Sequence, residues 1–110
     1  MYTTSIHCSY YSSFFSMKYF LHNHPRRSLS YTTQNSYKEK DSHTYISDEV
    51  FKRIIDSRDA RYFRTEYRIL KEDRKRADYT DEQFTDSESL DSIQRSKNIQ
   101  ATLKKVLSKR

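Results

Sequence analysis

Glycine is absent from this chain of 110 residues, and proline and cysteine each occur once. Without glycine, the chain has no candidate for a phosphate-binding glycine-rich loop or for the sharp turn that exposes a catalytic nucleophile. The single cysteine, Cys8, excludes an internal disulfide framework. Histidine is missing after His43, and the histidines and Cys8 lack the spacing of a zinc site. We therefore expect no enzyme activity, no metal and no other cofactor.

Long apolar stretches are missing as well. No run of 18 or more apolar residues occurs, so we expect no transmembrane span. Only 34% of the residues are hydrophobic, which leaves little material for a core. The net charge is +6, and a basic chain favours anionic partners. Carboxylates are absent from the first 38 positions, because all fifteen Asp and Glu residues lie at Glu39 or later.

The first third of the chain is rich in Ser, Thr, Tyr and Phe. One face of a helix would collect its regularly spaced apolar residues, which are Ile6, Tyr10, Phe14, Met17 and Leu21. Pro25 disfavours helix in the preceding residue, so we expect this helix to end near His22. A basic, acid-poor, hydroxyl-rich amphipathic segment is typical of a mitochondrial targeting presequence. We therefore predict a presequence over residues 1–36 that is largely disordered and only transiently helical. A disordered basic arm and a secretory signal are the alternatives.

The segment from Arg26 to Thr32 resembles mitochondrial presequence processing sites in two overlapping ways. Arg27 lies three residues before a cut that would follow Leu29. Arg27, Leu29 and Thr32 also fit the longer pattern with arginine at position −10, in which the mature chain begins near Tyr37. The resemblance implies a location in the mitochondrial matrix or on the matrix side of the inner membrane.

Residues 37–47 show no sustained period and are dense in polar residues, so we predict a flexible linker. A long helix then follows from Asp48 to Ala77, with Ser47 as its N-cap and no proline or glycine inside it.

A second helix is predicted from about Ser87 to Leu107, because Thr85 and Glu88 fit the capping-box pattern. The fold class is therefore all-α, and residues 48–107 are expected to form a basic hairpin of two long helices.

Cations line one stripe of the predicted first helix. They are Arg53, Arg61, Arg64, Arg68, Lys71 and Lys75. Such a stripe suits RNA or a ribosome, an acidic protein, or an anionic membrane surface, although a charged stripe can also be a solvated face. Carboxylates occupy the remaining arc, which we expect to be exposed and solubilising; they are Asp56, Asp59, Glu66 and Asp73.

Apolar residues form two further edges of this helix. One of these edges carries Phe63, Tyr67 and Leu70. The second helix is expected to cover one of the two edges with Ile99, Leu103 and Leu107, which leaves the other edge uncovered. Two helices with so few large apolar side chains barely offset their conformational cost. We therefore expect these six residues to mediate protein interaction, and a larger protein complex to complete the core.

Glu66, Tyr67 and Arg68 resemble the leucine-tyrosine-arginine motif of small mitochondrial assembly factors, with Glu66 in place of the leucine and the triplet late in the chain. Small size, basic charge and the N-terminal segment agree with such a protein. The function expected is a small non-catalytic accessory subunit or assembly factor of a mitochondrial complex, respiratory or ribosomal, acting by helix-mediated protein interaction. The alternatives are a basic RNA-binding module and a lineage-restricted protein without a defined partner.

Overall fold

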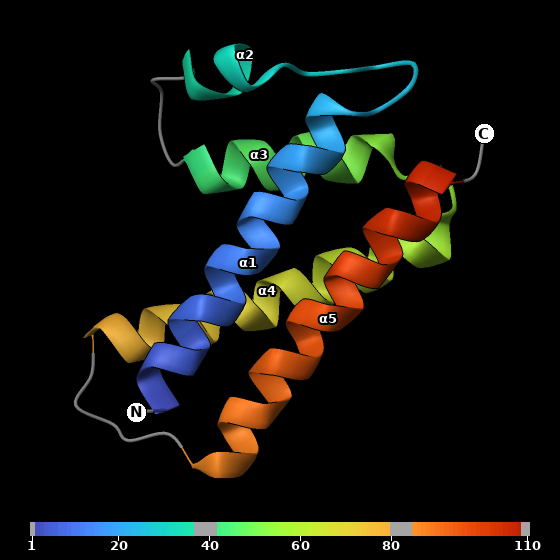
Figure 1. Cartoon of the computed structure of the whole chain (residues 1–110). Helices are drawn as coiled ribbons and strands as arrows, with labels where there is room; N and C mark the ends of the chain where they lie inside the picture. The colour runs from blue at the N-terminus through green and yellow to red at the C-terminus, as the bar shows by residue number, and fades with distance from the viewer. Residues whose placement is uncertain (1, 37–41, 80–84, 109–110) are drawn as a thin grey trace.

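Helices account for the architecture of the part of the chain that the structure describes. The computed structural model describes residues 2–36, 42–79 and 85–108, and these residues contain no strand (Figure 1). The all-α prediction is confirmed. A hairpin of two helices is wrong, since the described residues form five: α1 (Tyr2–His22), α2 (Tyr31–Ser36), α3 (Ser42–Arg53), α4 (Ser57–Tyr79) and α5 (Asp86–Ser108).

The N-terminal helix α1 is central to the core. It packs along α5 and against α4 and α3, as Figure 1 shows. Its fully buried apolar side chains are Ile6, Tyr10, Met17, Phe20 and Leu21, four of which belong to the face predicted from the spacing. The helix ends at His22 as predicted, but the expectation of a largely disordered segment is wrong. Because α1 covers the apolar edge of α4, both helices bury surface that neither could bury alone.

Serine completes a core that has few large apolar residues. The buried serines of α1 and α5 are Ser9, Ser13, Ser89, Ser92 and Ser96. Ser13 Oγ donates a hydrogen bond to Ser96 Oγ at 2.8 Å across the two helices. A buried hydroxyl is tolerated when it has such a partner. The polar composition of α1 is therefore compatible with a position inside the fold.

The predicted long helix from Asp48 to Ala77 is interrupted after Arg53. Asp56 caps the new start, because its carboxylate accepts hydrogen bonds from the backbone N–H groups of Arg58 at 2.8 Å and Asp59 at 3.3 Å. An aspartate N-cap satisfies amide groups that a continuous helix would bond internally. The N-cap predicted at Ser47 is wrong, since this residue lies inside α3.

Part of the predicted linker is helical, because α3 already begins at Ser42. The other linker positions, 37–41, lie outside the described residues.

The start of α5 was predicted correctly. The Thr85 backbone N–H donates to Glu88 Oε1 at 3.1 Å, and the Glu88 N–H donates to Thr85 Oγ1 at 3.1 Å, which is the reciprocal pair of a capping box. The Thr85 N–H and the guanidinium of Arg76 lower the pKa of Glu88. The helix runs from Asp86 to Ser108, close to the predicted bounds.

Three carboxylates of α4 face α5 rather than solvent. The contacts run antiparallel along the two helices: Asp59 with Lys105 at 3.0 Å, Glu66 with Arg95 and with Asn98 at 3.1 Å, and Asp73 with Ser92 at 3.1 Å. Glu66 is buried, and burial raises the pKa of Asp73. The expectation that these three carboxylates form an exposed arc is wrong. They pair with donors of α5 because this side of α4 is covered.

Candidate interaction surfaces

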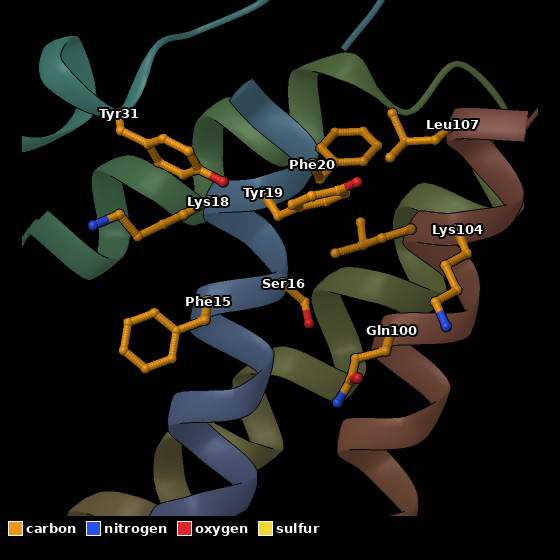
Figure 2. A pocket seen from close by; sticks show the side chains of 10 residues that line it. Phe15, Ser16, Lys18, Tyr19, Phe20, Tyr31, Gln100, Lys104 and Leu107 are labelled. Carbon is orange, nitrogen blue, oxygen red and sulfur yellow. The ribbon is translucent and has the colours of Figure 1, made fainter. Parts of the chain in front are cut away.

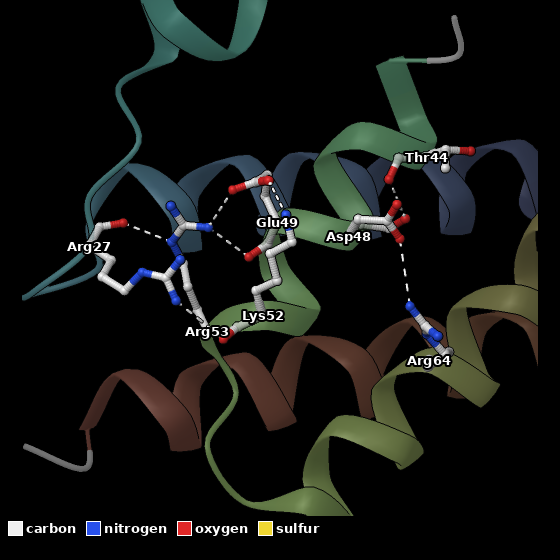
Figure 3. A network of polar contacts seen from close by, with 8 residues as sticks. Arg27, Thr44, Asp48, Glu49, Lys52, Arg53 and Arg64 are labelled. Carbon is white, nitrogen blue, oxygen red and sulfur yellow. Dashed lines mark hydrogen bonds and ion pairs between the residues drawn. The ribbon is translucent and has the colours of Figure 1, made fainter.

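Arg53 does not belong to an exposed basic stripe. It lies at the end of α3 and is buried, with its Nε donating to the backbone oxygen of Arg27 at 2.7 Å. Its Nη1 donates to the backbone and carboxylate oxygens of Glu49 at 2.7 and 3.0 Å (Figure 3). Burial pushes the pKa of Glu49 upward, but hydrogen bonds from Arg53 and Lys52 outweigh it and the pKa is lowered. Arg53 therefore holds the segment after α1 against α3.

The other predicted cations lie on α4, and they are Arg61, Arg64, Arg68, Lys71 and Lys75. Two of them contact α3. The guanidinium of Arg64 lies 4.0 Å from the ring centroid of Phe51 and 3.6 Å from Asp48 Oδ1 (Figure 3), and Lys71 Nζ donates to Thr44 Oγ1 at 3.1 Å. Arg61, Arg68 and Lys75 are exposed on the outer face. Of the predicted stripe, Arg61, Arg68 and Lys75 therefore remain as cations on the exposed outer face of α4.

The residues predicted for protein interaction are mostly internal. Phe63, Tyr67, Leu70, Ile99 and Leu103 are buried in the core, and Leu107 packs against it. Tyr67 shares a hydrogen bond of 2.9 Å with Tyr10, whose hydroxyl also lies 2.6 Å from His43 Nδ1. The edge formed by Phe63, Tyr67 and Leu70 is therefore covered within the fold, with Tyr67 in contact with α1. Of the triplet that resembles the assembly-factor motif, only Arg68 is exposed.

The residues predicted for presequence processing lie where α1 leads into α2. The backbone N–H of Leu29 donates to the Leu21 oxygen at 2.8 Å, and its side chain packs against the core. The Arg27 oxygen accepts the bond from Arg53 described above, and Thr32 is exposed in α2. A cut after Leu29 would separate α1 from the rest of the core.

An aromatic groove opens between α1 and α5, beside α2. Its volume is about 540 Å³, and its lining consists of Phe15, Ser16, Lys18, Tyr19, Phe20, Tyr31, Gln100, Leu103, Lys104 and Leu107. Figure 2 shows Tyr19 and Phe20 extending from α1 towards the α5 residues Lys104 and Leu107. Phe20 and Leu103 are buried at its base, whereas Phe15 is 64% and Tyr19 58% exposed. Exposed aromatic side chains gathered in one hollow are typical of a binding surface.

Sequence reasoning missed this groove because the N-terminal helix was assigned to targeting. A pattern that would have pointed to it is the spacing of Phe15 and Tyr19, which lie four residues apart and off the buried face. Both residues are more than half exposed. The helix thus carries two apolar faces, one for the core and one towards solvent.

A second hollow, of about 530 Å³, lies at the break between α3 and α4. Its lining is His24, Pro25, Arg26, Arg53, Ile55, Asp56, Asp59 and Val106. His24 Nδ1 accepts hydrogen bonds from the backbone N–H groups of Arg26 and Arg27, at 3.4 and 3.0 Å. Burial and the neighbouring Arg53 and Arg27 lower the pKa of His24. This histidine therefore acts as a neutral turn-forming acceptor.

Metal binding and membrane spanning find no support within the described ranges. No three His, Cys, Asp or Glu side chains there come together as ligands for a metal ion. None of the helices α1 to α5 combines the length and apolar character that crossing a membrane requires. Comparison of the chain with known protein families, with curated proteins and with solved structures finds no match.

Proposed function

We propose that this protein is a small non-catalytic accessory subunit that binds a partner protein through the aromatic groove. The observation that supports this best is the exposure of Phe15 and Tyr19 on a helix whose opposite face forms the core. Large aromatic side chains dominate the energetics of protein interfaces, since they bury much area at little conformational cost. In the unbound chain these two rings contact water over more than half of their surface.

The groove also lets the chain fold before it binds a partner. The apolar edges of α4 and α5 are already covered by α1, so the partner is not needed to complete the core. A partner would instead cover surface that the folded chain leaves open. Because the groove is formed by side chains of packed helices, it is held in shape before binding, which lowers the entropic cost of association.

The proposal extends to a mitochondrial complex, respiratory or ribosomal, on the composition of residues 1–38. Because α1 supplies much of the core, we expect an imported chain to keep this helix. Cell fractionation with N-terminal sequencing tests both points. A chain that resides in the cytosol would contradict the destination, and a folded mature form that begins after Leu29 would contradict retention.

Binding of RNA is the second candidate, and the exposed Arg61, Arg68 and Lys75 favour it. Sequence-independent RNA binding depends on neutralised phosphates and falls steeply with salt. The contacts of Arg64 and Lys71 with α3 leave fewer cations for this task than the sequence indicates.

Photo-crosslinking in cells tests the groove directly. A photoreactive phenylalanine analogue at Phe15 should capture a defined partner, whereas the same analogue at Ile55, which is 96% exposed in the other hollow, should not. With the purified partner, Tyr19→Ser should weaken binding at least tenfold and Ile55→Ser should leave it unchanged. Equal capture at both positions, or binding that is indifferent to Tyr19→Ser, would refute the proposal.

A further inference from the structure

Charge is distributed very unevenly along the chain. Residues 39–91 hold eleven Lys and Arg residues and all fifteen Asp and Glu residues, a net charge of −4. The other ten Lys and Arg residues lie in residues 1–38 and 92–110, where no Asp or Glu occurs. The excess positive charge therefore comes from the two ends of the chain, although α4 carries the more conspicuous basic stripe.

The fold brings these two acid-free stretches together. Helix α1 lies in one and most of α5 in the other, and the two helices pack side by side (Figure 1). The aromatic groove is formed entirely by residues from the two stretches. Among the residues that the structure describes, the charged ones in its lining are Lys18 and Lys104, and none is a carboxylate. A ligand in this groove would meet cations without competing internal anions.

The two lysines stand on opposite walls of the groove. Lys18 Nζ donates to Asn35 Oδ1 of α2 at 2.7 Å and lies 5.7 Å from the ring centroid of Phe14, which holds its charge between α1 and α2, on the side away from α5 (Figure 2). Lys104 is exposed on α5, and Figure 2 shows it beside the opening. Between them lies the apolar base of Phe20 and Leu103. The arrangement is an apolar trough with a cation on each side.

The length of the groove suits a helix of a partner protein. Its α5 wall runs from Gln100 to Leu107, a separation of seven residues, which is about 10 Å at the rise of an α-helix. An amphipathic helix that lies in a groove presents anchors at i, i+4 and i+7 over a similar length. Opposite charges beside those anchors would face Lys18 and Lys104, and complementary potentials favour such pairing.

We propose that the occupant of the aromatic groove is an amphipathic helix of the partner protein, with large apolar anchors and Asp or Glu residues on both flanks. This inference rests on the proposed function and specifies its ligand. Single-stranded nucleic acid fits less well, because two cations of the described chain line the groove, too few to follow a phosphate backbone. A bilayer fits less well because the surface is hollow rather than protruding.

The test uses two designed helical peptides and the intact chain. Both peptides carry Leu at i, i+4 and i+7, and they differ only in Glu or Lys at the flanking positions. Binding is followed by fluorescence anisotropy of a labelled peptide. We expect the Glu peptide to bind at least tenfold more tightly than the Lys peptide. Phe15→Ser should abolish this difference by removing binding, and circular dichroism should show that this exposed substitution leaves the fold intact.

Charge reversal at a groove residue distinguishes the effect of a charge inside the groove on peptide binding from the effect of the chain's net charge. Lys104→Glu should lower the affinity for the Glu peptide by about threefold to tenfold, as expected for one exposed attractive pair that becomes repulsive. The same substitution should raise the affinity for the Lys peptide. Lys75→Glu makes the same change of net charge on the outer face of α4, and it should leave both affinities unchanged. An equal effect of the two substitutions would overturn the proposal.

Other ligands are tested with the same variants. Tighter binding of an oligouridylate, or of vesicles containing phosphatidylglycerol, that is lost in Phe15→Ser would assign the groove to nucleic acid or to lipid and overturn the proposal. A partner that crosslinks at Phe15 but is insensitive to Lys104→Glu would refute the acidic helix and leave the proposed function standing. Absence of any specific crosslink at Phe15 would instead refute the proposed function itself.

Discussion

Two substitutions on α1 test whether this helix is part of the core. Leu21 is fully buried, whereas Phe15 is 64% exposed, although both are large apolar side chains of the same helix. Truncating a fully buried leucine to alanine costs about 2–5 kcal/mol, because the transfer energy is lost and a cavity remains. We therefore expect Leu21→Ala to lower the free energy of unfolding by this amount. Phe15→Ala should cost less than about 1 kcal/mol, although it removes more atoms.

The loss at Leu21 is large compared with the stability of the whole chain. Domains of this size unfold with about 5–15 kcal/mol, and 1 kcal/mol shifts the melting temperature by about 4–8 °C. Leu21→Ala should thus lower the melting temperature by roughly 10 °C or more. Urea denaturation followed by circular dichroism measures the free energies, and a thermal melt checks them. Removing residues 1–29 should lower the free energy of unfolding still more, because the core then loses the fully buried apolar side chains of α1 described above.

Two results would refute the assignment of α1 to the core. Equal effects of Leu21→Ala and Phe15→Ala would show that α1 does not hold its buried face against the other helices. A cooperative melt of residues 30–110, with the urea dependence of the full chain, would show that the remaining helices form a core alone. Either result would restore the interpretation of residues 1–36 as a removable leader.

Three other expectations follow from local contacts. Thr85→Ala removes the cap of α5 and should cost about 1 kcal/mol in urea denaturation, whereas an unchanged midpoint would exclude the capping box. His24 has a lowered pKa in the folded state, so its contribution to stability is complete above pH 6.5 and is lost as the pH falls through the folded-state pKa. His24→Asn keeps a turn acceptor without titrating and should flatten that pH dependence; an unaltered slope would contradict this role. Replacing Arg61, Arg68 and Lys75 by Gln should reduce the salt slope of RNA binding if the exposed basic face of α4 binds phosphates, and an unchanged slope would exclude this face.

Local sequence rules predicted the features that depend on neighbouring residues. The end of α1 at His22 follows from Pro25, and the start of α5 follows from the capping box at Thr85. The buried face of α1 follows from the spacing of its apolar residues. Such features need only a few positions along the chain, so their physical cause is visible in the sequence.

The features that depend on distant contacts were not predictable in the same way. The residues around Ile54 do not by themselves require the helix to break. The break is explained by packing, because it allows α3 to pack on α1 while α4 packs on α5. The exposed carboxylate predicted at Glu66 is buried because Arg95, 29 residues away, donates to it. The candidate interaction site differs from the predicted one for the same reason. Helix α1 covers Tyr67 and Leu70 and exposes its own aromatic face to solvent. Which helices pack against each other decides which residues are buried or exposed, and amino-acid composition alone does not reveal this packing.

The pairing of α1 with α5 has a consequence for biosynthesis. Translation produces α1 first among the five helices and α5 last, so the hydroxyl-rich helix emerges from the exit tunnel long before the surface that buries it exists. The core cannot close while the nascent chain is still growing, because closure joins segments separated by more than eighty residues, such as Ser13 and Ser96. During this interval the apolar face of α1 is accessible to chaperones. If the chain is imported as proposed, folding and import compete for this surface, and the order of synthesis gives import the first opportunity.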